Sequence, residues 1–238
     1  MNKVAFVPAR AGSKRFPNKN ISELGGKPLV CWTLEAFLKS RCFDKIIFSS
    51  DSVEYLDIVQ NYLNSDQVVF HQRTTKEASD KVKIFDYLVE NAHKWVNQQD
   101  IFVLGLPTCP FRNEFHVKEC FDLFYKYKKS VFTATEYDFS VPFAFSIVDQ
   151  ESLTWKTLLE NSPLITGNTR SQDQVNYFHP NGGVYLLEAK EILNGRINTF
   201  YENAIPYIMD IFDSFDIDTE RDLLMAKLYL RSREHKKY

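Results

Sequence analysis

The stretch Arg-Ala-Gly-Ser-Lys-Arg-Phe-Pro-Asn-Lys-Asn occupies residues 10–20, after the apolar run Val4 to Val7 and before a helical pattern that opens near Pro28. A strand followed by such a loop presents backbone N–H groups and positive charge together, which is how proteins hold a polyphosphate. Small residues in the loop let a ligand approach the backbone. The alternative is a solvated basic loop. The loop contains no acid and four cations, Arg10, Lys14, Arg15 and Lys19.

Two better-known phosphate loops are absent from the sequence. Gly25-Gly26-Lys27 is followed by Pro28 and lacks the upstream glycine of the G-x-x-x-x-G-K-[ST] motif, and no G-x-G-x-x-G motif occurs. A standard nucleoside triphosphatase and a dinucleotide-dependent dehydrogenase are therefore disfavoured. The nucleophile motif G-x-S-x-G is missing as well.

The composition is that of an ordinary globular protein with a full hydrophobic core. The chain has 238 residues, of which 44% are hydrophobic and 15% aromatic, and its formal net charge is −2. This charge gives no reason to expect nucleic acid or a membrane as a partner. The first thirty residues nevertheless carry six Lys or Arg against the single acid Glu23. The positive charge is local, which suits a small anionic ligand.

The cysteines show no CxxC spacing, so we interpret them as reduced thiols rather than a disulfide framework. They are Cys31, Cys42, Cys109 and Cys120. The N-terminal apolar run is much shorter than the hydrophobic region of a signal peptide, and no segment approaches transmembrane length. We therefore expect a cytoplasmic protein.

Strand and helix patterns alternate along the first half of the chain. Strands are expected at residues 4–7, 45–49, 68–70 and 101–104, and helices at 28–39, 55–63, 84–95 and 117–124. This alternation is typical of βαβ units, so we predict an α/β fold with a doubly wound, mainly parallel sheet. Ligands of such sheets bind at the carboxyl ends of the strands. The segments expected at that edge are 10–20, 49–52, 71–80 and 105–112.

The alternation breaks between Val131 and about Tyr185. We expect one domain over residues 1–238 with a small inserted antiparallel arm at about 136–182. Such an arm covers the site or pairs with a second subunit, and a mobile surface loop is the alternative. Antiparallel strands are expected at 133–137 and 143–148, a polar loop at 161–179, further strands at 183–187 and 204–211, and a last helix from 219 to about 230.

The segment Phe215-Asp216-Ile217-Asp218 alternates apolar and acidic residues. In an extended segment this spacing points both carboxylates the same way. Such a pair suits Mg²⁺, which binds through one or two carboxylates plus substrate phosphates. The alternative is that both acids flank or cap the final helix, and the spacing alone leaves both interpretations open. The polyphosphate loop favours magnesium, since no other acidic pair in the sequence is placed as well.

Eight motifs lie in a fixed order along the chain. They are Pro-Ala-Arg-Ala-Gly-Ser-Lys-Arg-Phe-Pro-Asn-Lys-Asn at 8–20, Leu-Gly-Gly-Lys-Pro-Leu at 24–29, Phe-Asp-Lys-Ile-Ile-Phe-Ser-Ser-Asp-Ser at 43–52, Ala-Ser-Asp at 78–80, Pro-Thr-Cys-Pro-Phe-Arg at 107–112, Arg-Ser-Gln at 170–172, Pro-Asn-Gly at 180–182 and Phe-Asp-Ile-Asp-Thr-Glu at 215–220. With these motifs the sequence resembles the CMP-sialic acid synthetase family, cytidylyltransferases that activate acidic keto-sugars. The first and last motifs are highly specific, and the middle ones are weaker individually.

The resemblance implies a nucleotide-diphospho-sugar transferase-like fold and the transfer of CMP from CTP to an acidic nonulosonic sugar. In this family the loop at 10–20 holds the triphosphate, an arginine matching Arg73 contacts the base, and two aspartates bind Mg²⁺. The arm pairs two protomers, and Arg170 matches an arginine that faces the sugar. The implied catalytic residues are Arg10, Lys14, Lys19, Asp216 and Asp218, the last two as metal ligands. The implied substrate-binding residues are Ser13, Asn20, Arg73, Asp80, Leu106, Arg170, Gln172, His179 and Asn181.

Three departures from the family pattern fall on the expected sugar side. Leu106 stands where relatives have Gln, Cys109 replaces a serine, and His179 stands where sialic acid enzymes often have arginine. The motifs therefore support CTP and leave the sugar open among sialic, legionaminic, pseudaminic and Kdo-type acids. The other alternative is a nucleotide-binding module without catalysis, although a pure binder need not keep Mg²⁺ ligands. The sequence identifies no general base.

Overall fold

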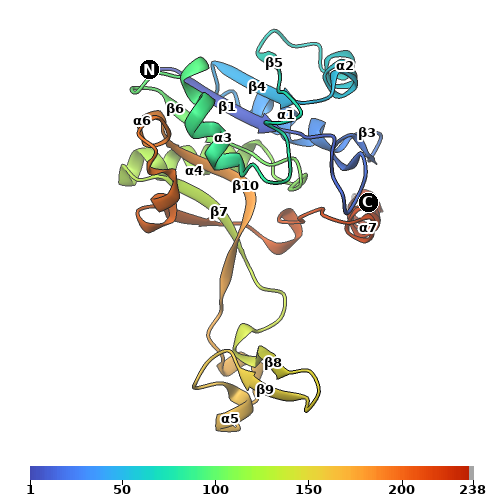
Figure 1. Ribbon diagram of the computed structural model, residues 1–238, viewed down its shortest axis with the longest axis vertical. Coiled ribbons are helices and arrows are strands. Elements are labelled where there is room, and N and C mark those ends of the chain that lie inside the picture. Colours follow the sequence, from blue (N-terminus) through green and yellow to red (C-terminus); the bar gives the residue numbers. More distant parts are fainter. Residues whose placement is uncertain (236–238) are drawn as a thin grey trace.

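A computed structural model describes residues 1–235, apart from the side chains of 197–199, 234 and 235. Its central sheet is built from β1 (Lys3–Pro8), β4 (Lys45–Ser50), β5 (Val68–Gln72), β6 (Ile101–Leu104), β7 (Val131–Glu136), β10 (Phe178–Glu188) and β11 (Ile205–Ile208). The strand order is β11-β7-β10-β6-β1-β4-β5 (Figure 1). Only β10 runs antiparallel to its neighbours, β6 and β7, among the pairs of this sheet that the structure describes. The predicted mainly parallel sheet is confirmed.

Helices cover both faces of this sheet, as expected for a doubly wound fold. The helices are α1 (Leu29–Ser40), α2 (Val53–Tyr62), α3 (Ile84–Asn91), α4 (Glu114–Tyr127), α5 (Pro163–Thr166), α6 (Ala189–Leu193) and α7 (Glu220–His235). The 3-10 turns are η1 (Lys19–Ile21), η2 (Ala92–Lys94), η3 (Val141–Phe143), η4 (Ser171–Asp173), η5 (Arg196–Glu202) and η6 (Ile211–Asp213). No helix within residues 1–235 is both long and apolar enough to cross a membrane.

Alternation of buried residues along β1 assigns the helices to the two faces. Ala5 and Val7 pack in one core cluster with side chains of α1, α2 and α4. Val4 and Phe6 pack in another with side chains of α3 and α6. Because side chains of a strand alternate between faces, β1 is buried on both sides, which explains its continuous apolar run.

A third core cluster joins the two ends of the chain. Ile217, Leu223 and Ala226 of the C-terminal segment pack against Phe16 and Leu24 of the N-terminal region. The same cluster contains Leu29 and Phe111. Figure 1 shows α7 beside the short hairpin formed by β2 (Glu23–Leu24) and β3 (Lys27–Pro28). The basic loop and the acidic segment are therefore held on the same side of the molecule.

The end of α7 differs from the sequence prediction. The helix was expected to stop near Leu230, and it continues to His235. Arg233 explains part of the extension, because its guanidinium lies 3.3 Å from Asp213 and its Cζ lies 5.5 Å from the ring centroid of Tyr229. Strand β11 is shorter than expected, since Asp210 caps the following turn by accepting the N–H of Phe212 at 2.8 Å.

The segment between β7 and β10 projects away from the sheet (Figure 1). It contains the antiparallel hairpin of β8 (Phe145–Asp149) and β9 (Thr154–Thr157), which forms a sheet of its own. The loop expected at 161–179 is partly structured, because Ser162 caps α5 and Pro163 occupies its first turn. Strand β10 already begins at Phe178, and its first residues pair with the end of β7.

Arg112 braces the turn that follows β6 against the rest of the core. Its side chain is 2% exposed and donates hydrogen bonds to the carbonyls of Gly183 and Leu106 and to the hydroxyl of Thr33. Burial lowers the pKa of Arg112 to about 10, so the guanidinium stays charged at neutral pH. Within residues 1–235 it forms no ion pair with a carboxylate. The charge is instead solvated by backbone and hydroxyl oxygens.

Replacing Arg112 with Met should lower the free energy of unfolding by about 3 kcal/mol, because buried oxygens of Gly183, Leu106 and Thr33 lose their donor. Urea unfolding followed by circular dichroism measures this change. The control is Arg231→Met on the exposed part of α7, which should stay within about 0.5 kcal/mol of the wild type. Equal stability of both variants would show that Arg112 is no brace.

Candidate active site

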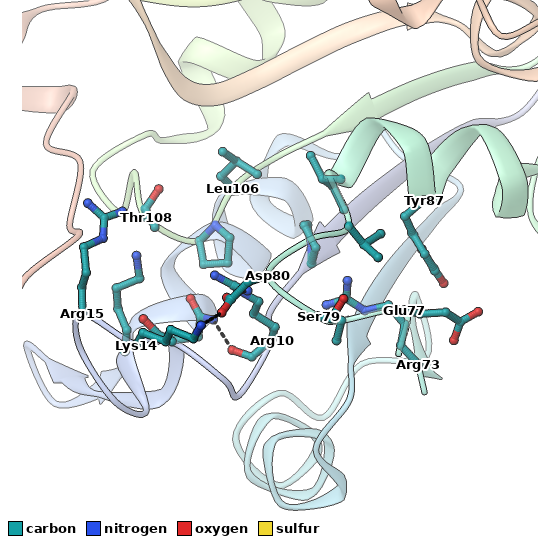
Figure 2. A pocket seen from close by; sticks show the side chains of 18 of the residues that line it. Arg10, Lys14, Arg15, Arg73, Glu77, Ser79, Asp80, Tyr87, Leu106 and Thr108 are labelled. Carbon is teal, nitrogen blue, oxygen red and sulfur yellow. Dashed lines mark hydrogen bonds and ion pairs between the residues drawn. The ribbon is translucent and has the colours of Figure 1, made fainter. Parts of the chain in front are cut away.

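A cavity of about 530 Å³ lies at the carboxyl ends of the central strands. Its walls come from the loop at 10–20, the segment 73–87, the turn 106–108 and Asp218 (Figure 2). The strand tip at 49–52 lies directly behind, where Asp51 accepts the N–H of Ala11 at 2.9 Å. The expected gathering of these segments at one edge of the sheet is confirmed.

Several hydrogen bonds fix the shape of the basic loop. The side-chain amide of Asn20 donates to the carbonyl of Arg10 at 2.9 Å and ties the two ends of the loop together. Asn18 adopts the left-handed conformation, with φ 56°, and accepts from the hydroxyl of Tyr55 at 3.1 Å. Asn tolerates this conformation better than most residues. Ser13 also lines the cavity, so the loop presents backbone, hydroxyl and cationic groups to one space.

Asp80 bridges two cations of the loop. It pairs with Arg10 and with Lys14, whose Nζ lies 2.6 Å from the carboxylate. Hydrogen bonds from Lys14 and then Arg10 lower the pKa of Asp80. Asp80 belongs to the Ala-Ser-Asp motif, so the motif positions the loop as well as lining the cavity.

Asp218 bridges the other two loop cations. Its carboxylate lies 2.8 Å from Nζ of Lys19 and 2.7 Å from the guanidinium of Arg15. Desolvation acts against ionisation, yet hydrogen bonding from Lys19 and the charges of Lys19 and Arg15 lower the pKa of Asp218 overall. Arg15 is one of the four loop cations, and the family resemblance implies no site role for it. The place of Arg15 in the site follows from its ion pair with Asp218, which is far from it in the sequence.

Asp216 lies next to Asp218 in a different environment. Desolvation raises the pKa of Asp216, and the like charge of Asp218 acts in the same direction, while a hydrogen bond from Thr108 opposes them. Asp216 as a whole is exposed to solvent. The desolvation therefore comes from protein atoms packed around its carboxyl group, and the side chain is not completely enclosed. Ile217, between the two acids, is fully buried and donates its N–H to the carbonyl of Thr108 at 2.8 Å.

The donor set at Asp216 and Asp218 fits Mg²⁺ in chemical terms. Two adjacent carboxylates repel each other, and Asp216 forms no ion pair in the described part of the chain. Residues 1–235 contain no group of three or more His, Cys, Asp or Glu able to hold a metal. A pair of carboxylates completed by substrate phosphates is a common arrangement for Mg²⁺.

The nucleobase-binding residue implied by the resemblance, Arg73, is buried and lines the cavity. Its backbone N–H donates to the carbonyl of Ser50 at 2.8 Å, and its guanidinium lies over the ring of Tyr87, with Cζ 5.4 Å from the centroid. Figure 2 shows Arg73, Glu77 and Tyr87 at one end of the cavity and Lys14, Arg15 and Thr108 at the other. Sequence analysis missed Glu77, Thr108 and Tyr87. The turn motif at 107–112 was the one signal for Thr108.

Four predicted substrate contacts do not line this cavity. Arg170 and Gln172 are exposed on the arm, and Arg170 pairs with Asp173 at 3.8 Å. His179 packs against Tyr137, with ring centroids 4.6 Å apart. Asn181 is only 3% exposed, and its amide is occupied by the N–H of Gly183 and the hydroxyl of Ser214. Asn181 therefore stabilises β10 from within the core. Among the described residues predicted to contact the sugar, Leu106 alone lines the cavity.

The fold and the cavity define a nucleotidyltransferase of the α/β class. A family described as cytidylyltransferase matches residues 4–104. The chain is 30% identical over 233 residues to the CMP-N,N'-diacetyllegionaminic acid synthase of Legionella pneumophila, with 95% of each protein covered. It is 28% identical over 233 residues to the pseudaminic acid cytidylyltransferase of Campylobacter jejuni, with 96% of each covered.

A third relative is longer than this chain. The N-acylneuraminate cytidylyltransferase of Escherichia coli is 30% identical over 225 residues, and the match covers 94% of this chain and 51% of that protein. The chain thus spans about half the length of the Escherichia coli relative. From these relatives, the chain belongs to the CMP-sialic acid synthetase family, the acylneuraminate-type cytidylyltransferases.

Solved structures support the fold. CMP:2-keto-3-deoxy-manno-octonic acid synthetase complexed with CTP has a TM-score of 0.68 and 17% identity, with 98% of this chain and 100% of that chain covered. The 4-diphosphocytidyl-2C-methyl-D-erythritol synthase of Anaerococcus prevotii has a TM-score of 0.65 and 17% identity, with 97% and 96% covered. At this identity the likeness concerns the fold alone, and it agrees with the predicted nucleotidyltransferase architecture.

Asp216→Asn and Asp218→Asn should shift thermal stability in opposite directions at pH 7 in the presence of EDTA. A raised pKa means that ionised Asp216 destabilises the fold above that pKa, so Asp216→Asn should raise the unfolding midpoint. A lowered pKa means that ionised Asp218 stabilises the fold above its unfolded pKa of about 3.9, so Asp218→Asn should lower the midpoint. Differential scanning fluorimetry measures both.

The difference for Asp216→Asn should shrink as the pH falls toward the unfolded pKa of about 3.9, since the folded carboxyl is protonated above that pH. The difference for Asp218→Asn should shrink only as the pH falls below about 3.9. Shifts of the same sign at pH 7 would contradict the assigned environments of Asp216 and Asp218.

Proposed function

We propose that this protein is a cytidylyltransferase that activates an acidic nonulosonic keto-sugar with CTP, giving a CMP-sugar and pyrophosphate. The observation that carries the proposal is the convergence of Lys19 and Arg15 on Asp218 in a cavity that also contains Arg10 and Lys14. Four cations beside a carboxylate pair match the charge of a nucleoside triphosphate bound with a divalent cation. The names of the relatives support CTP and a nonulosonic acid as substrates.

In this proposal the loop at 10–20 binds the triphosphate. Arg10, Lys14 and Lys19 contact phosphate oxygens, with Ser13 and Asn20 shaping the loop around them. Asp216 and Asp218 hold Mg²⁺, which supplies neutralisation of phosphate charge when bound. Arg73 binds the base at the other end of the cavity. The proposed phosphate-binding residue Lys14 and the proposed base-binding residue Arg73 lie at opposite ends of the cavity in Figure 2.

The chain contributes to the reaction mainly by positioning and by electrostatics. The anomeric hydroxyl of the sugar attacks the α-phosphorus in line, the bond to the β-phosphate oxygen breaks, and pyrophosphate leaves. Such a transfer asks for little covalent chemistry from the protein. Lys14, Lys19 and Arg10 stabilise the negative charge that grows on the leaving pyrophosphate. Asp218 in turn keeps Lys19 in place through their ion pair.

Leu106 lines the cavity, so we infer that the sugar makes an apolar contact there. The proposed sugar is a sialic, legionaminic or pseudaminic acid. The Kdo-type acid is the alternative, since a synthetase for it shares the fold. The remaining alternative is a protein that binds a nucleotide without catalysing a reaction. We also propose a cytoplasmic location without nucleic acid or membrane partners, which the four free cysteines support.

Pyrophosphate release with CTP, Mg²⁺ and a panel of acidic sugars tests the activity. The wild type should release pyrophosphate with at least one nonulosonic acid, and Asp218→Asn should reduce turnover by about three orders of magnitude, because the proposed Mg²⁺ site and the anchor of Lys19 are both lost. Asp57→Asn, at an exposed position of α2, is the control and should keep wild-type activity. Release with a Kdo-type acid alone would identify the alternative sugar.

We further propose that the arm forms a homodimer. Its hairpin exposes large apolar side chains, with Phe145 at 56%, Ile147 at 48% and Trp155 at 51%. Soluble monomers rarely present such residues contiguously. Arg170, Gln172 and His179 do not line the cavity of their own protomer, so a dimer in which they reach the neighbouring site would give them the substrate role that the resemblance implies.

Ile147→Asp should convert the dimer to a monomer, because a charge then replaces an apolar contact at the proposed interface. Sedimentation analysis measures the mass, and the activity assay should show a loss if arm residues serve the partner's site. Phe115→Asp is a matched control on α4, where the side chain is 64% exposed and lies outside the arm. Retention of the dimer in Ile147→Asp would reject this interface.

A further inference from the structure

A cluster of ionisable side chains lies outside the active-site cavity, directly before the acidic segment. It is formed by Asp213 of η6, His116 of α4 and Arg233 of α7. One carboxylate oxygen of Asp213 lies 3.6 Å from Nε2 of His116, and the other lies 3.3 Å from the guanidinium of Arg233. None of the three lines the active-site cavity, and the family resemblance implies no role for them. The cluster joins three separate elements at a residue that leads into Asp216 and Asp218.

The two ion-pair partners of Asp213 differ in exposure. The side chain of Arg233 is 53% exposed, and ion pairs of such exposed groups contribute little to stability. The side chain of His116 is only 12% exposed, and that of Asp213 is 20% exposed. The contact between His116 and Asp213 is therefore better shielded from water, and we expect it to be the stronger constraint on Asp213.

The tautomer of His116 follows from the cap of helix α4. Nδ1 of His116 accepts the backbone N–H of Asn113 at 3.2 Å, while the side chain of Asn113 accepts the N–H groups of Phe115 and His116. A backbone N–H can only donate, so Nδ1 carries no proton and the proton of the neutral ring sits on Nε2. Burial lowers the pKa of His116, which keeps the ring neutral at pH 7. Nε2–H therefore faces the carboxylate of Asp213.

Histidine is not the usual residue at this position of a helix cap. In a capping box the third residue of the helix is most often Glu or Gln, whose side chain accepts the same backbone N–H. A glutamate at this position would keep that bond and place a second carboxylate beside Asp213. His116 keeps the cap and presents a hydrogen-bond donor to Asp213 instead.

A short, fixed stretch of chain connects Asp213 to the acidic pair. The carbonyl of Asp213 accepts the S–H of Cys109 at 3.7 Å, and Cys109 is fully buried. Four residues later, the N–H of Ile217 donates to the carbonyl of Thr108 at 2.8 Å. Both ends of this stretch are thus bonded to the turn that follows β6. A displacement of Asp213 would therefore be passed on to Asp216, which precedes Ile217.

We propose that His116 is a positioning residue for the proposed Mg²⁺ ligands, and that it acts through Asp213 to fix where the carboxylates of Asp216 and Asp218 lie. In this arrangement His116 touches neither the metal nor the substrate. The inference rests on the proposed function, because it takes Asp216 and Asp218 as metal ligands. A change at His116 should alter what Mg²⁺ contributes to CTP binding and leave the contribution of the basic loop unchanged.

The decisive variant is His116→Glu, which keeps an acceptor for the cap and adds a carboxylate beside Asp213. Calorimetric titration with CTP, without sugar, measures the affinity once in Mg²⁺ and once in EDTA, and the ratio of the two affinities is the contribution of the metal. This ratio should fall about tenfold in His116→Glu, because losing the support around metal ligands typically weakens a metal site by at least that factor. The affinity for CTP in EDTA should stay at the wild-type value.

Two further variants separate the added charge from the loss of the ring. His116→Gln keeps an acceptor for the cap without a charge, and its affinity ratio should stay within about twofold of the wild type. Adding Asp213→Asn to His116→Glu removes the repulsion and should restore most of the ratio. His93→Glu makes the same substitution at an exposed histidine outside the cavity, and this matched control should leave the ratio unchanged. Circular dichroism verifies that the variants fold.

The outcomes separate this inference from the proposed function. If the wild type forms CMP-sugar and His116→Glu retains the wild-type ratio, or loses CTP affinity equally in Mg²⁺ and in EDTA, positioning by His116 is rejected and the activity stands. If the wild type forms no CMP-sugar but Mg²⁺ strengthens its CTP binding and His116→Glu reduces that gain, the positioning role stands and the activity fails. The inference is also rejected by a double variant no better than His116→Glu, or by a wild type that binds CTP equally in Mg²⁺ and in EDTA.

Discussion

The bridge from Lys19 and Arg15 to Asp218 is the interaction on which this site depends. Lys19 and Asp218 are 199 residues apart in sequence, and their side-chain atoms lie 2.8 Å apart. No local propensity produces that contact. It follows from the central place of β1 in the sheet and from the apolar cluster in which Ile217 packs with Phe16. The core therefore delivers two polar segments of opposite charge to one place, and the charges then fix their relative position.

The turn after β6 shows how close packing supports the same site. Gly182 has φ +75°, and a Cβ there would lie 2.9 Å from Cδ1 of Leu106. Leu106 in turn donates its N–H to the carbonyl of Gly182 at 3.0 Å. Arg112 holds the same turn from the inside through the carbonyl of Leu106. The position of Leu106 in the cavity wall thus follows from a glycine and a buried arginine that do not themselves line the cavity.

The sequence predicted what depends on pattern and missed what depends on orientation. Periodicity indicates the strands and helices of the first half, and the spacing of Asp216 and Asp218 indicates a carboxylate pair. The same periodicity places Tyr87 on the apolar stripe of α3, and its ring does pack in the core with Phe6. Only the three-dimensional structure shows that the same side chain also lines the cavity, with its ring beneath the guanidinium of Arg73. Arg170, Gln172 and His179 were expected at the sugar from the resemblance alone, and in the described structure they lie outside the cavity.

The cations of the cavity are partly neutralised by two acids, Asp80 and Asp218, before a ligand binds. Asp80 joins Arg10 to Lys14, and Asp218 joins Arg15 to Lys19, and of these cations Lys19 is the one whose side chain is largely enclosed, at 11% exposed. A largely enclosed side chain such as that of Lys19, ordered in advance, saves about 0.5–1.5 kcal/mol on binding. The same acids reduce the net positive field, so a simple anion gains little from the loop. A polyphosphate carries several negative groups along one chain and can pair with both sets of cations, whereas a single anion can pair with one set only.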